Sequence, residues 1–206
     1  MPARLRLLAA AVVVTAAGVG VGLYTHDPDG GKPTPADGPG HTASTLTDVD
    51  TTAMVVRRQA FCDHVATAEV TKALGGDAIE ASSYGDGDKA ELGGETDVAQ
   101  EYACTWTGQN GTAARAWVFA PPVTKGWARR LAGSLPQGCE RRPGPAYGKP
   151  SVAFACTNGK RTTVSLRGLF GDAWLSCDLV GARGETADEV GKRADRWCLM
   201  TAVAAG

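Results

Sequence analysis

Two segments with the same pattern of residues constrain the fold of this chain more than any other feature. Residues 101–118 read EYACTWTGQNGTAARAWV, and residues 154–166 read FACTNGKRTTVSL. Each has an aromatic residue, then Ala-Cys-Thr, and then an Asn-Gly pair, Asn110-Gly111 in the first and Asn158-Gly159 in the second. Because these residues tolerate the positive φ angles that a two-residue hairpin turn requires, we predict two β-hairpins, each held in place by its cysteine.

Three helices are predicted around these hairpins. The first ends at Gly75-Gly76, because glycine accepts the left-handed conformation at a helix C-terminus. The second begins at Pro121-Pro122, since proline is favoured at the first helical position. The third begins at residues 186–189, TADE, which match a capping box.

Six strands are predicted, in two groups of three: residues 78–84, 98–107 and 112–120, then 151–157, 161–166 and 173–180. In the last strand Leu175, Cys177 and Leu179 alternate with polar or aromatic residues, as in a sheet with one face inward. The glycine-rich acidic segment 86–95 is predicted to be a loop, and it lacks the ligand spacing of an EF-hand calcium site. The order α-β-β-β-α-β-β-β-α predicts an α+β domain with a mostly antiparallel sheet.

The N-terminal part of the chain differs in composition from the rest. Residues 1–25 are a predicted membrane anchor or signal peptide: Leu7–Tyr24 carries no charge and follows Arg4 and Arg6. Residues 26–54 are rich in Pro, Gly, Asp, Ser and Thr, which predicts a disordered linker. Residues 55–206 form the predicted folded domain, placed outside the plasma membrane by a single pass or, alternatively, secreted.

The charges of the chain are nearly balanced. Its 21 basic and 22 acidic residues give a formal net charge of −1. A balance of this kind gives no general attraction to nucleic acid, so no nucleic-acid partner is expected.

The six cysteines of the chain, all in residues 55–206, indicate disulfides. An even cysteine count behind an export signal is typical of an oxidising compartment. Zinc is a poor alternative, because no two cysteines have the close spacing that zinc ligands usually have. Sequence alone does not choose among the possible pairings, but the order of elements favours neighbours: Cys62–Cys104, Cys139–Cys156 and Cys177–Cys198.

Part of the chain resembles a family of bacterial domains. Phe61-Cys62, the segment ATAEVTKALGG and Tyr102-Ala103-Cys104-Thr105-Trp106 resemble the cysteine-bearing cell-envelope domains of unknown function that are common in actinobacteria. The resemblance covers residues 61–118 and implies a PsbP-like fold, an antiparallel sheet with helices packed on it. Many of these relatives are lipoproteins, but this chain has no cysteine near the end of its apolar N-terminal run.

A catalytic site is not evident in the sequence. His64 is the only histidine in residues 55–206, and a hydrolase would have to pair it with Ser82, Ser83 or Ser165. No Gly-x-Ser-x-Gly nucleophile motif occurs. We therefore expect no enzyme activity, no cofactor and no metal site.

Basic and aromatic residues of the second half suggest a ligand site instead. If the arginines converge near the second hairpin they would form a basic rim, with a tryptophan as a flat wall, suited to a carboxylate or phosphate. The candidate ligand-binding residues are Arg129, Arg130, Arg141, Arg142, Arg161, Trp106 and Trp174.

Three classes of function follow from these features. The first is a non-catalytic extracellular binding or sensing module, tethered through Leu7–Tyr24, whose partner is an anionic envelope ligand or an envelope protein. The second is a structural or assembly partner in the cell envelope. The third, a hydrolase, lacks an evident base and nucleophile pair.

Overall fold

The computed structural model describes residues 45–92 and 94–206, which form an α+β domain. Leu7–Tyr24 and most of the predicted linker lie outside the described residues. The elements are α1 (Thr67–Leu74), β1 (Ala78–Tyr84), β2 (Lys89–Leu92), β3 (Glu95–Val98), β4 (Glu101–Gly108), β5 (Ala113–Phe119), α2 (Lys125–Gly133), β6 (Cys139–Arg141), β7 (Ser151–Asn158), β8 (Arg161–Phe170), β9 (Ala173–Val180) and α3 (Ala187–Ala204).

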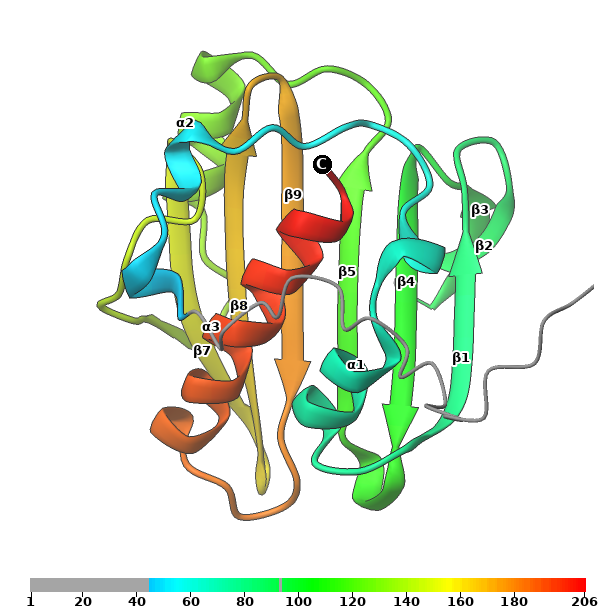
Figure 1. Cartoon of the computed structure of the whole chain (residues 1–206), viewed down its shortest axis with the longest axis vertical. Coiled ribbons are helices and arrows are strands. Elements are labelled where there is room, and N and C mark those ends of the chain that lie inside the picture. Colours follow the sequence, from blue (N-terminus) through cyan, green and yellow to red (C-terminus); the bar gives the residue numbers. More distant parts are fainter. Residues whose placement is uncertain (1–44, 93) are drawn as a thin grey trace, which may run out of the picture. The chain divides into compact units, whose positions relative to one another are not determined.

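A seven-stranded antiparallel sheet is the centre of the domain (Figure 1). Its strand order is β1-β4-β5-β9-β8-β7-β6, and β2 and β3 form a separate two-stranded sheet. The order places β5 beside β9, so the two predicted hairpins join into one sheet through the last strand.

Helices α1 and α3 cover one face of this sheet, in front of it in Figure 1. Strand residues that point to this side, such as Cys104, Val118 and Leu175, pack with Val190, Trp197 and other apolar residues of the two helices. The α3 residues Val190, Ala194 and Trp197 are buried. This face carries the larger of two apolar cores.

Helix α2 packs on the opposite face but covers only part of it. Its buried residues Ala128 and Ala132 contact Val152, Phe154 and Trp174, which alternate along β7 and β9 with residues of the first core. The main contacts of α2 are with β7 and β8, and Trp127 also packs on Phe119 at the end of β5. The part of this face formed by β1, β4 and β5 is therefore left without a helix.

The three predicted disulfides are confirmed. Cys62 pairs with Cys104, Cys139 with Cys156, and Cys177 with Cys198. The first links the segment before α1 to β4, the second links the edge strand β6 to its neighbour β7, and the third fixes α3 against β9. Each bridge joins sequence neighbours, as the order of elements indicates.

The turns of the two hairpins differ from each other. Asn110 and Gly111 both have positive φ, 60° and 70°, as predicted, but the last paired residues of β4 and β5 are Thr107 and Ala113, so the connection is longer than the predicted two residues. In the second hairpin Asn158 pairs with Arg161, so the central turn residues are Gly159 and Lys160, not Asn158 and Gly159. Of Asn158, Gly159 and Lys160, only Gly159 has a positive φ angle. A two-residue turn with glycine at its first central position requires this conformation.

Four predictions about the elements and their limits are corrected by the structure. Residues 86–95, predicted as a loop, contain β2 and the start of β3, and β6 is a further strand outside the six predicted ones. Helix α2 begins at Lys125, with Thr124 accepting a hydrogen bond from the Trp127 amide, and not at Pro121-Pro122. The folded domain begins before residue 55, since Leu46 is 1% exposed and packs in the first core.

The helices of residues 45–92 and 94–206 include none that is both long and apolar enough to cross a membrane.

Candidate functional site

A groove of about 900 Å³ lies on the part of the sheet that α2 leaves open. Side chains of β4, β5 and β9 form its floor, and the segment around β2 and β3 lies along one side. Phe119, Pro121 and Trp127 line the other side. The groove therefore has a rigid base of hydrogen-bonded strands and two different walls.

Asp178 of β9 is the central polar residue of the floor. In the sheet it lies opposite Arg115 of β5 on one side and Ser165 of β8 on the other. Its Oδ1 atom is inaccessible to solvent and has no hydrogen-bond partner in the described part of the chain. Burial raises the pKa of the Asp178 carboxyl, while Ser165 and the charges of Arg167 and Arg115 act in the opposite direction.

A stack of an arginine and two aromatic rings lies beside this carboxylate. The Arg167 guanidinium is 5.7 Å from the ring centroid of Trp117 and 4.8 Å from that of Phe154. Both distances are within the range of cation–π contacts. Of these three residues only Trp117 lines the groove. Trp117, Ser176 and Arg167 lie in one row across the sheet, so the guanidinium contacts the indole from the side of β8.

The near edge of the floor carries a second carboxylate. The Tyr84 hydroxyl donates a 2.6 Å hydrogen bond to Glu101 Oε1, which joins β1 to β4 across the mouth of the groove. Burial and the adjacent Glu101 carboxylate both raise the pKa of Tyr84, so the phenol keeps its proton and remains a donor.

The wall formed by the β2–β3 hairpin is acidic. Glu91 of β2 and Asp97 of β3 line the groove, and the Thr96 hydroxyl donates a hydrogen bond to Glu91. Backbone hydrogen bonds of 2.9 Å from Gly87 to Ala99 and of 2.8 Å from Ala99 to Asp88 close the base of the hairpin. The hairpin is thereby held beside the floor without joining the main sheet.

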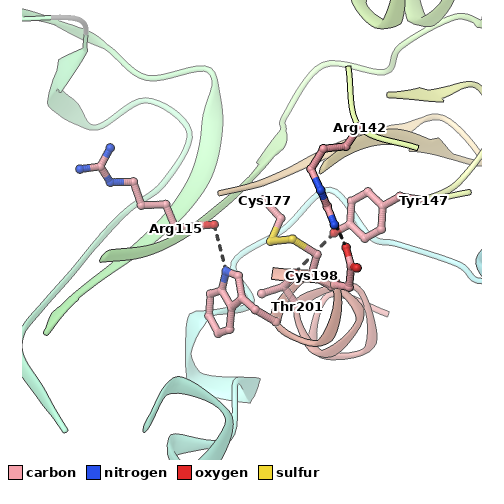
Figure 2. The surroundings of a disulfide bond; sticks show 8 residues. Arg115, Arg142, Tyr147, Cys177, Cys198 and Thr201 are labelled. Carbon is pink, nitrogen blue, oxygen red and sulfur yellow. Dashed lines mark hydrogen bonds and ion pairs between the residues drawn. A yellow bond between two sulfur atoms is a disulfide. The ribbon is translucent and has the colours of Figure 1, made fainter. Parts of the chain in front are cut away.

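Arg115 connects the groove to the opposite side of the sheet. Its carbonyl oxygen accepts a 3.4 Å hydrogen bond from Trp197 Nε1 of α3, next to the Cys177–Cys198 disulfide. Figure 2 shows its side chain pointing away from α3 and the disulfide. The guanidinium is exposed and lines the groove. The packing of α3 therefore positions the strand that carries this cation.

The arginines predicted to form a basic rim are not gathered into one. Arg141 donates to the carbonyl oxygens of Ala132 and Gly133 at the end of α2, whereas Arg142 forms an ion pair with Asp195 of α3. Arg161 donates to carbonyl oxygens of the first hairpin turn. Arg129 and Arg130 are exposed on α2. Arg141 and Arg142 thus bind elements on opposite faces of the sheet.

The two tryptophans predicted to form a ligand wall belong to the cores. Trp174 is 1% exposed and packs under α2, while Trp106 packs edge-on against Trp197 with ring centroids 5.4 Å apart. The tryptophans that line the groove are Trp117 and Trp127. The alternation of Trp117 with inward-facing residues on β5, as for Asp178 on β9, is the sequence signal that marks the open face.

His64 lies in a smaller hollow of about 320 Å³, which Ser83 and Asp88 also line. Its Nδ1 atom is 3.3 Å from the carbonyl oxygen of Ala204. The side-chain hydrogen bonds of residues 45–92 and 94–206 include none between His64 and Ser83, and no group of three metal-ligating residues is found there.

Comparison with known proteins leaves the chain without a family assignment. No protein-family model matches the sequence, and a search of curated proteins gives no match. A crystal structure of a GTP-binding regulator from Thermotoga maritima is similar over 68% of this chain and 94% of that chain, with 12% identity and a TM-score of 0.30. A TM-score of this size supports no argument about fold or function.

Proposed function

We propose that this protein is a non-catalytic extracellular binding module and that the groove on the open face of the sheet is its binding site. The groove has the size of a small-molecule site and combines aromatic walls with a few polar groups directed at one region. The proposed binding site is therefore the floor formed by β4, β5 and β9, and not the arginine rim that was predicted from the sequence.

One observation carries this proposal. Asp178 Oδ1 lies at the floor of the groove without solvent contact and without a hydrogen-bond partner in the described residues. A buried polar atom left unpaired lowers stability by about 1–3 kcal/mol. Because Asp178 also lines the groove, a ligand that donates to the accessible part of its carboxyl group would offset that penalty, which gives the arrangement a functional reason that stability does not provide.

The cellular placement is part of the same proposal. Three disulfides support an oxidising compartment. We propose that Leu7–Tyr24 tethers the domain to the plasma membrane, with the domain outside. The proposed relatives are the cysteine-bearing envelope domains with a PsbP-like fold.

A compound screen with a blocked groove tests the proposal. The full chain, with its disulfides intact, is titrated with a library of small cations, anions and neutral compounds while tryptophan fluorescence is recorded, because Trp117 and Trp127 line the groove. The blocking variant is Thr105→Phe, whose side chain is added on the floor at β4.

The matched control is Thr107→Phe, two residues along the same strand and outside the groove lining. Compounds that bind the unmodified chain and the Thr107→Phe variant but not Thr105→Phe support a groove site. If every hit binds all three proteins equally, or no compound binds, the groove is not the binding site of a small molecule.

A further inference from the structure

We propose that the groove binds a small organic cation, an amine or guanidinium attached to an apolar body, with Asp178 as its counter-ion. This inference rests on the proposed binding function and adds the chemical class of the ligand.

The lining of the groove is dominated by carboxylates. It contains Glu91, Asp97, Glu101 and Asp178 but only one guanidinium, that of Arg115. Ion pairs in the described part of the chain involve none of these five side chains. Arg115 and Arg167 offset part of the negative charge of Asp178. The other three carboxylates form no ion pair in the described part of the chain, so a cation is the ligand that complements the remaining charge.

The two kinds of carboxylate act at different depths. Glu91 and Asp97 are exposed on the hairpin and would attract a cation from solvent. Asp178 at the floor has an oxygen without a partner, and Glu101 accepts one hydrogen bond, from Tyr84, at its Oε1 atom. An ammonium or guanidinium group has enough donors for the Asp178 carboxylate, whereas Glu101 lies farther along the sheet, opposite Phe119, and would attract the cation from a distance.

The aromatic residues of the groove suit the rest of such a ligand. Phe119 and Trp127 pack with ring centroids 6.1 Å apart and form an apolar wall above the floor. Trp117 already contacts one cation, the Arg167 guanidinium, which shows that this indole is placed to interact with positive charge. A ligand cation over the groove side of Trp117 would use the same attraction.

Two other ligands fit less well. A metal ion needs several ligands converging at short distance, and no group of three His, Cys, Asp or Glu residues is close enough for that in residues 45–92 and 94–206. An anion would meet four carboxylates for one arginine. A volume of about 900 Å³ also corresponds to an organic molecule and not to a bare ion.

Three probes of nearly the same shape test the charge preference directly. Phenethylamine is the cation, 2-phenylethanol the neutral analogue and 3-phenylpropionate the anion, each titrated into the full chain at neutral pH. We expect the amine to bind at least about tenfold more tightly than either analogue, a difference that corresponds to about 1.4 kcal/mol. Replacing Asp178 by Asn should remove most of this preference.

Glu140→Gln is the matched control, because it removes one carboxylate from the exposed strand β6, outside the groove lining. It should leave the amine preference unchanged. Equal binding of the three probes, no binding of the amine, or an equal loss in both variants overturns the cation assignment. If a neutral compound or an anion binds and is lost in Thr105→Phe, the binding function stands and only the ligand class is wrong.

Discussion

Removing the Cys177–Cys198 disulfide should destabilise the protein more than removing Cys139–Cys156, although the two bridges close loops of similar length. Their sequence separations are 21 and 17 residues. The chain-entropy relation for a cross-link then gives about 3.3 and about 3.1 kcal/mol at 25 °C. By loop closure alone the two bridges are nearly equal.

Burial separates them. Cys177 and Cys198 are both 0% exposed, between α3 and the sheet, whereas Cys139 and Cys156 are partly exposed at the sheet edge. Removing each buried sulfur leaves a small cavity in the core and costs about 1 kcal/mol more. The expected loss in free energy of unfolding is therefore about 5 kcal/mol for the core pair and about 3 kcal/mol for the edge pair.

Chemical denaturation of the full chain measures the difference. Each bridge is removed as a double Cys→Ala variant, so that no free thiol is left to form a wrong pair. In thermal unfolding the core variant should lose roughly 10–20 °C in Tm and the edge variant roughly 6–12 °C. Equal losses within about 0.5 kcal/mol, or a larger loss for the edge pair, would refute the assignment of the difference to burial.

Three further predictions concern single residues. Asp178→Asn should raise the free energy of unfolding at pH 7 by about 1–2 kcal/mol. Because burial raises the pKa of Asp178 in the folded state, the wild-type protein loses stability as the pH rises through that pKa and the carboxyl ionises. Urea unfolding should therefore show that the advantage of the variant over the wild type becomes smaller in acid. Glu69→Gln should lower the free energy of unfolding by about 1–2 kcal/mol at pH 7. Two 2.7 Å hydrogen bonds from Arg196 lower the pKa of Glu69, so the destabilisation should vanish as the pH falls through that lowered pKa. A destabilisation that is constant with pH would contradict the assignment of the effect to the Glu69–Arg196 pair. Gly168→Ala should lower the free energy of unfolding measured by calorimetry by at least about 3 kcal/mol, or prevent folding, because the added Cβ would overlap the backbone carbonyl of Tyr147. The control Gly133→Ala places its Cβ in open space and should leave stability unchanged or increase it.

Local signals in the sequence predicted the elements well. The positive φ angles at Asn110 and Gly111 and the capping box at Thr186 come from interactions within a few residues. The bounds of β9 follow from alternation in the chain itself. Because each of these features depends on neighbouring residues, the sequence contains the information needed to predict it.

The hairpin of β2 and β3 was missed for a physical reason. Apart from Ala90, Leu92 and Val98 its residues are polar or glycine, and all of β3 is exposed, so the segment shows no alternation of buried and exposed residues in its sequence. Its strands are held by backbone pairing, from Lys89 with Val98 to Leu92 with Glu95, which does not depend on the type of side chain. Composition alone therefore describes this segment as a loop.

The groove could not be predicted because its floor is assembled across the sheet. Arg115 lies beside Asp178 only because β5 pairs with β9, which is distant in sequence. The arginine clusters, in contrast, are adjacent in sequence but bind different elements, as Arg141 and Arg142 show. Proximity in sequence was thus a poor guide to proximity at the site.

The independence of the β2–β3 hairpin bears on how this protein could acquire a different specificity. Among the described residues its two strands pair with each other and not with the seven-stranded sheet. Substitutions and insertions in residues 89–98 therefore leave the cores and the three disulfides untouched, while they alter the acidic wall of the groove. Variation or directed evolution confined to this hairpin would change which molecule is accepted without a cost in foldability.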